Sequence, residues 1–79
     1  MRARWKYVVY IDADGDEVLE TFDPEIIHAR YVADEGVAIG RLVSAGFATV
    51  HGECYGHSTS LNLSSRPHAD TALLREQIR

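Results

Sequence analysis

Seven acidic residues lie between positions 12 and 25 of this 79-residue chain, and no lysine or arginine occurs between positions 7 and 29. The seven are Asp12, Asp14, Asp16, Glu17, Glu20, Asp23 and Glu25. Carboxylates at this density repel nucleic acid phosphates and attract basic protein surfaces. The acidic block therefore predicts a docking surface for a positively charged protein partner and argues against direct nucleic acid binding. The alternative is that these charges only keep a small domain soluble.

The start of the acidic block, residues 12–17, also resembles half of a calcium-binding loop, because acids recur at alternate positions. Such loops need glycine at the sixth position for their sharp turn. This sequence has Glu17 there, and its glycine, Gly15, comes earlier, where a hairpin turn needs it. The sequence favours an exposed acidic hairpin tip without a metal cofactor.

A second group of reactive residue types lies further along the chain, at His51, Glu53, Cys54 and His57. These are zinc ligand types, and a cysteine near a histidine is also the usual pair for nucleophilic catalysis. On an extended strand, however, His51 and Glu53 share one face while Cys54 points to the other. A chain of this size also has little room for an enclosed substrate pocket. We therefore expect no enzymatic activity and no cofactor, with a small metal site here as a weaker alternative.

The acidic block lies on a predicted hairpin formed by strands 6–12 and 17–22. Both segments are rich in β-branched and aromatic residues, which suit a pleated, half-buried surface. The Asp-Gly dipeptide at 14–15 is a strong signal for a two-residue loop. The register that follows has two core pairs on one face: Ile11 opposite Val18, and Tyr7 opposite Phe22.

A helix is predicted over residues 24–35. Asp23 is a suitable N-cap, Pro24 suits the first helical position, and Gly36 suits the left-handed conformation that ends a helix. Residues 37–40 form either a last turn or a connector.

The second half of the chain predicts another hairpin and helix. Residues 42–50 read as a strand in which Gly46 marks a bulge or the close approach of another backbone. The turn is expected at 51–52 and a return strand over 53–63, with an irregularity at Gly56. A second helix is expected from 64–67 onward. Its apolar stripe comprises Leu73, Leu74 and Ile78.

The order β-β-α-β-β-α over residues 1–79 predicts one α+β domain. We expect a two-layer sandwich in which two helices cover one face of a four-stranded antiparallel sheet, leaving the other face or an edge for a partner. Hydrophobic residues make up 46% of the chain and charged residues 25%, which are ordinary globular values. No apolar run approaches the roughly 20 residues of a membrane span, and a single cysteine allows no internal disulfide. We expect a cytoplasmic protein that does not bind membranes.

Residues 43–70 contain the pattern SAGF…CYGxSxSLxLxSRPxxD. This string resembles small proteins encoded by phages and prophages. The resemblance implies a phage or mobile-element context, in which small acidic proteins often inhibit host machinery and anti-CRISPR proteins are the best-known group. It implies no activity for any single residue.

The sequence and the resemblance together predict an inhibitor that binds a host protein complex, such as a CRISPR effector, inside the host cell. Its acidic hairpin would occupy a basic nucleic-acid-binding surface, because complementary charge gives fast and selective docking. Tyr10 or Trp5, if exposed, is expected to add an aromatic anchor. The alternative is a structural or regulatory homodimer that pairs through a free sheet edge and the apolar residues 37–39.

Overall fold

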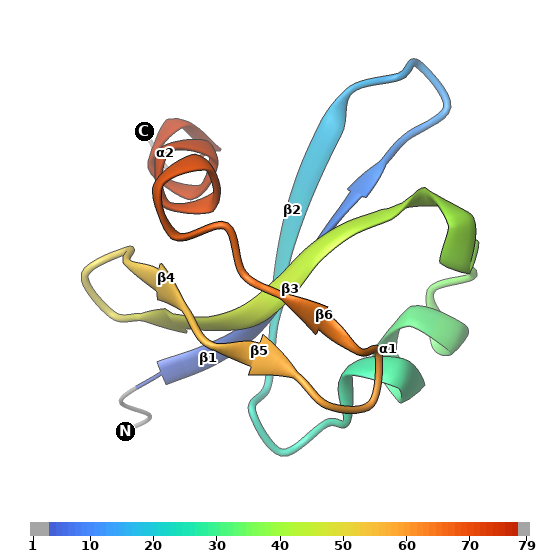
Figure 1. The fold of residues 1–79 in the computed structure, drawn as a ribbon, viewed down its shortest axis with the longest axis horizontal. Coiled ribbons are helices and arrows are strands. Elements are labelled where there is room, and N and C mark those ends of the chain that lie inside the picture. Colours follow the sequence, from blue (N-terminus) through green and yellow to red (C-terminus); the bar gives the residue numbers. More distant parts are fainter. Residues whose placement is uncertain (1–3, 78–79) are drawn as a thin grey trace.

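The computed structural model describes residues 4–77 of the chain (Figure 1). Its elements are β1 (Arg4–Ile11), β2 (Glu17–Phe22), α1 (His28–Asp34), the 3₁₀ helix η1 (Ile39–Arg41), β3 (Leu42–Thr49), β4 (Cys54–Tyr55), β5 (His57–Ser58), β6 (Leu63–Ser64) and α2 (Pro67–Gln77). Four strands form an antiparallel sheet in the order β2-β1-β3-β4, and β5 and β6 form a separate pair beside β3. The predicted α+β class with a four-stranded antiparallel sheet is confirmed.

The two helices lie on opposite faces of the sheet, which corrects the expected arrangement on one face. Leu74 of α2 packs in a cluster with Tyr7 and Val9, whereas Val32 of α1 packs in another with Val8. Successive strand residues point to opposite faces, so Val8 and its two neighbours must be covered from different sides. Tyr7, Val8 and Val9 are all fully buried. An uninterrupted apolar run in the middle of β1 therefore requires cover on both faces, and Figure 1 shows the helices on opposite sides of the molecule.

The first hairpin forms as predicted, but its register differs by one residue. The Asp12 N–H donates to the Asp16 carbonyl (2.9 Å) and the Gly15 N–H to the Asp12 carbonyl (3.1 Å), so the loop has three residues rather than two. Gly15 takes a φ of 86°, as this loop requires. Lys6, not Tyr7, therefore lies opposite Phe22. A slip of one residue exchanges the two faces of a strand, and the expected pairing of Tyr7 with Phe22 is wrong.

The first helix begins at His28, four residues later than predicted. Asp23 caps a turn instead of the helix. Its Oδ1 accepts the Glu25 N–H at 2.8 Å, and its carbonyl accepts the Ile26 N–H at 3.0 Å. This local side-chain turn competes with helix formation over the first residues of the predicted range 24–35.

The end of α1 agrees with the sequence. Gly36 has a φ of 72°, and the Val37 N–H donates to the Val32 carbonyl at 3.0 Å, which closes the helix in a Schellman motif. Residues 37–40 then act as a connector that includes the start of η1.

In the second half, β3 follows the predicted strand, but the return strand is broken. β4 leaves the sheet at Gly56, whose φ of 84° marks the predicted irregularity. Residues 59–62 then form a turn rather than a strand. The helix start is confirmed, with Pro67 as the first residue of α2. Leu74 is buried and Leu73 packs against the same cluster, while Ile78 lies outside the described residues.

Candidate functional site

Three of the predicted site residues meet at the tip of the β1–β2 hairpin. Asp12, Asp14 and Asp16 place carboxylate oxygens within 4.8 Å of one another, and we call these three residues the hairpin tip. Asp12 Oδ1 accepts the backbone N–H groups of Asp14 (2.9 Å) and Asp16 (3.0 Å), so this carboxylate holds the loop in shape. Asp14 and Asp16 are exposed, and no base among residues 4–77 pairs with them. The hairpin tip therefore holds three carboxylates close together in a loop that is fixed by hydrogen bonds.

Glu20 points away from the tip, onto the face covered by α1. Its carboxylate accepts the Tyr10 hydroxyl at 2.6 Å and the Tyr31 hydroxyl at 2.7 Å. The hydrogen bond to Glu20, with some burial, raises the pKa of Tyr10 to about 12. Tyr10 is half-buried and its hydroxyl is bonded within the protein, so its role as an aromatic anchor stays a prediction that involves only the exposed part of its ring.

Glu17 points to the other face, toward α2. It accepts two hydrogen bonds from the Arg66 guanidinium, at 2.8 and 3.1 Å, and this contact holds the pKa of Glu17 below its usual value. Asp23 and Glu25 lie in the turn before α1. The seven acids thus do not form one surface, because alternation along β2 separates Glu17 from Glu20.

The bases of β1 and η1 are engaged with other groups. Arg41 Nη1 donates to the Ile11 carbonyl (3.3 Å) and to the Asp12 carbonyl (2.9 Å), which ties the start of β3 to the hairpin. Lys6 donates to the Ile26 carbonyl at 2.8 Å, and Arg4 lies 4.2 Å from the centre of the Phe47 ring. Arg41 bonds backbone carbonyls and not the carboxylates of Asp14 and Asp16, which are exposed to solvent.

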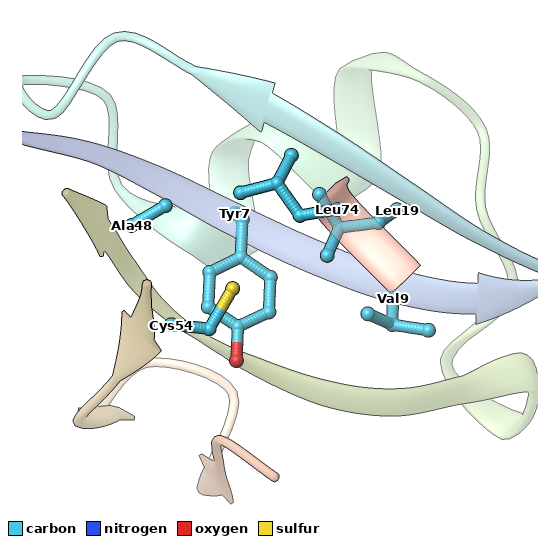
Figure 2. Packing of buried hydrophobic residues seen from close by; sticks show 6 residues of the cluster. All are labelled: Tyr7, Val9, Leu19, Ala48, Cys54 and Leu74. Atoms are coloured by element: carbon cyan, nitrogen blue, oxygen red, sulfur yellow. The ribbon is translucent and has the colours of Figure 1, made fainter. Parts of the chain in front are cut away.

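The second predicted group does not converge. His51, Glu53 and His57 are exposed, whereas Cys54 is buried in the cluster with Tyr7 (Figure 2). Among residues 4–77, these four side chains do not come close enough to share a metal ion. Burial, together with the charge of Asp70, raises the pKa of the Cys54 thiol to about 11. A buried thiol with a raised pKa lacks the setting of a catalytic nucleophile.

We expect the Cys54 thiol to react with Ellman's reagent at pH 8 at least about 100-fold more slowly than a free cysteine, because the raised pKa reduces the thiolate fraction by that factor. Because the folded pKa is higher than the unfolded one, this group stabilises the fold fully below pH 9, and that contribution is lost as the pH rises toward 11. The same protein in concentrated urea is the control. Equal rates in the folded and unfolded protein would contradict the burial of Cys54.

A buried polar network at the start of α2 was not predicted from the sequence. Asp70 is fully buried, and its Oδ2 accepts the Tyr7 hydroxyl at 2.5 Å and the Arg66 N–H at 2.9 Å. Arg66 Nε donates to Asp70 Oδ1 at 3.0 Å. Burial and the hydrogen bond from Tyr7 to Asp70 raise the pKa of Tyr7 well above its usual value. The i, i+4 spacing of Arg66 and Asp70 was a visible signal, but nothing local pointed to Tyr7.

His28, at the start of α1, is a second buried polar residue that the sequence did not single out. Its Nε2 lies 3.0 Å from the Gly46 carbonyl, and its ring meets those of Phe22 and Phe47 edge-on. Burial lowers the pKa of His28. These contacts make it an anchor for α1 on the sheet.

The outer edge of β2 is already paired at one residue. The Leu19 N–H donates to Gln77 Oε1 (3.0 Å), and Gln77 Nε2 donates to the Leu19 carbonyl (2.8 Å). The amide of Gln77 thus replaces one residue of a neighbouring strand. A homodimer that pairs through this edge has to displace Gln77.

None of the helices in residues 4–77 is long and apolar enough to cross a membrane. Comparisons of the chain with protein-family models, with curated proteins and with solved structures found no match.

Proposed function

We propose that this protein is a non-enzymatic binding protein whose hairpin tip docks on a basic surface of another protein. One observation carries the proposal: Asp14 and Asp16 are exposed, lie within 4.8 Å of each other and of Asp12, and meet no base in the described part of the chain. The Asp12 turn fixes the loop, so little conformational freedom is lost on binding. Charge held in this way steers a basic partner and fixes its orientation.

We further propose that the partner is a nucleic-acid-binding complex of a bacterial host. The protein would then be an anti-CRISPR inhibitor that acts inside that cell. This further proposal is supported by the resemblance of residues 43–70 to phage-encoded proteins. The hairpin tip would take the place of nucleic acid phosphates in a basic channel, because the arginine and lysine side chains that bind phosphates also bind carboxylates.

The test is the double variant Asp14→Lys/Asp16→Lys, which we call the tip variant. We expect it to weaken binding to the partner by about 100-fold, since like charges placed opposite each other cost several kcal/mol. The measurement is displacement of DNA or RNA from purified CRISPR effector complexes, followed by fluorescence anisotropy.

The matched control is Glu53→Lys/Glu76→Lys, which changes the net charge equally at two exposed positions away from the tip. It should bind within about threefold of the wild type, because neither residue belongs to the hairpin tip and exposed charges that do not face the partner are screened by salt. Equal losses in both variants would show a nonspecific charge effect and contradict docking through the tip. If the wild-type protein displaces nucleic acid from none of the effectors, the proposal of anti-CRISPR inhibition is contradicted.

A further inference from the structure

A hollow of about 390 Å³ lies beside the hairpin tip. It is bounded by the end of β1, the hairpin loop and the segment that leads from α1 to β3. Ile11, Ala13, Val37 and Ala38 contribute its apolar lining. A surface of this kind suits a chain of methylene groups, which gains from leaving water. We call it the tip hollow.

The charged groups of the tip hollow are mainly negative. Asp12 and Glu35 both line it. The base that lines it, Arg41, donates to two backbone carbonyls of the hairpin and not to either carboxylate. Tyr10, another lining residue, keeps its hydroxyl bonded to Glu20, so its hydroxyl does not compete for either carboxylate. The hollow therefore combines an apolar wall with carboxylates that favour a cation.

A second hollow of about 300 Å³ adjoins the first, and both are lined by Val37. Its other residues are mostly apolar and include Ala33, Leu61 and Ile39, whose side chain is 78% exposed. This neighbour adds an uncharged contact area next to the acidic one, on the same side of the molecule as α1.

We infer that the tip hollow receives a lysine or arginine side chain of the protein partner, with its stem on Val37 and Ala38 and its cation at Asp12 and Glu35. Long basic side chains bury their stems along apolar surface while the charged head stays at a polar rim. An aliphatic neighbour of that basic residue fits the adjoining hollow beside Ile39. The inference rests on the proposed function, because it names the partner group that the acidic end of the protein holds.

The probe is the peptide acetyl-Arg-Leu-Arg-Leu-amide, titrated into ¹⁵N-labelled protein and followed by amide chemical shifts. The control peptide carries citrulline, an uncharged analogue, in place of arginine. We expect the arginine peptide to move the amide signals of Ala13, Gly36 and Val37 saturably. The citrulline peptide should bind at least tenfold more weakly.

Two variants with the same charge change localise the binding. Glu35→Lys should lower the affinity for the arginine peptide at least tenfold. Glu76→Lys should change that affinity by no more than about twofold, because Glu76 is exposed but belongs to α2, the helix on the opposite face. Thermal melting of both variants checks that they fold. Equal affinities for the two variants, or shifts scattered over acids on both faces, would overturn the inference.

The tip variant separates this inference from the proposed function. If the peptide shifts only residues 14–16 and Glu35→Lys binds like the wild type, the tip hollow is wrong while docking through the tip stands. If the peptide occupies the hollow but the tip variant keeps full affinity for the protein partner, the hollow stands and the tip is wrong.

Discussion

Replacing Asp70 by alanine is expected to lower the free energy of unfolding by about 3–5 kcal/mol, because hydrogen bonds to a charged group contribute about 1.5–3 kcal/mol each and the Asp70 carboxylate accepts from both Tyr7 and Arg66. Asp70 is fully buried and accepts hydrogen bonds from the Tyr7 hydroxyl and from the Arg66 main chain and side chain. Without this carboxylate, a buried hydroxyl and part of a guanidinium lose their acceptor. Urea unfolding followed by circular dichroism measures the change.

Two further variants grade the effect. Tyr7→Phe removes one donor from the network and should cost about 1–3 kcal/mol. Glu17→Gln weakens only the exposed contact of Arg66 and should cost less than about 1 kcal/mol. If Asp70→Ala were no more destabilising than Glu17→Gln, the buried network would not stabilise the fold as argued.

Gly46→Ala is expected to be the second most damaging substitution, with a loss of about 3 kcal/mol or more. A Cβ at this position would overlap the backbone carbonyl oxygen of Tyr55, and it would also lie 3.3 Å from Ser65 Cβ. A backbone oxygen held in the β3–β4 pairing cannot turn aside as a flexible side chain can. Thermal unfolding of the purified variant measures the loss.

Gly40→Ala is the matched control. A Cβ at Gly40 meets nothing within 4 Å, and this glycine does not have a positive φ. Its substitution should change the free energy of unfolding by no more than about 0.5 kcal/mol. Equal stability of the two alanine variants would contradict the close approach of β4 to Gly46.

Glycine positions were the most predictable part of this fold. As their sequence contexts indicated, Gly36 ends α1 and Gly56 interrupts the return strand. Gly46 allows the close approach of the Tyr55 backbone, which was also expected. The hairpin register was not predictable in the same way. An Asp-Gly pair fits a two-residue loop, but glycine also fits the last position of a three-residue loop. The two loops differ in length by one residue. Because of that difference, Tyr7 and Phe22, which were expected to pair on one face of the sheet, lie on opposite faces.

The candidate site was predictable only where it is local. Asp12, Asp14 and Asp16 lie in one short loop, so their proximity follows directly from the sequence. Glu17 and Glu20 are separated by strand alternation and are bonded by side chains from other elements. Arg66, which bonds Glu17, lies 49 residues away along the chain, and a reading of local patterns does not detect such a partner.

The pairing of Gln77 with Leu19 has a consequence for how the chain folds during synthesis. Leu19 and Gln77 are 58 residues apart, so a ribosome adding roughly 5–20 residues per second makes the second about 3–12 s after the first. Throughout that interval, the outer edge of β2 has no amide to occupy it. An unpaired edge is a template for pairing with other strands. We therefore expect the newly made hairpin to be most prone to aggregation, and to chaperone binding, until α2 has been synthesised.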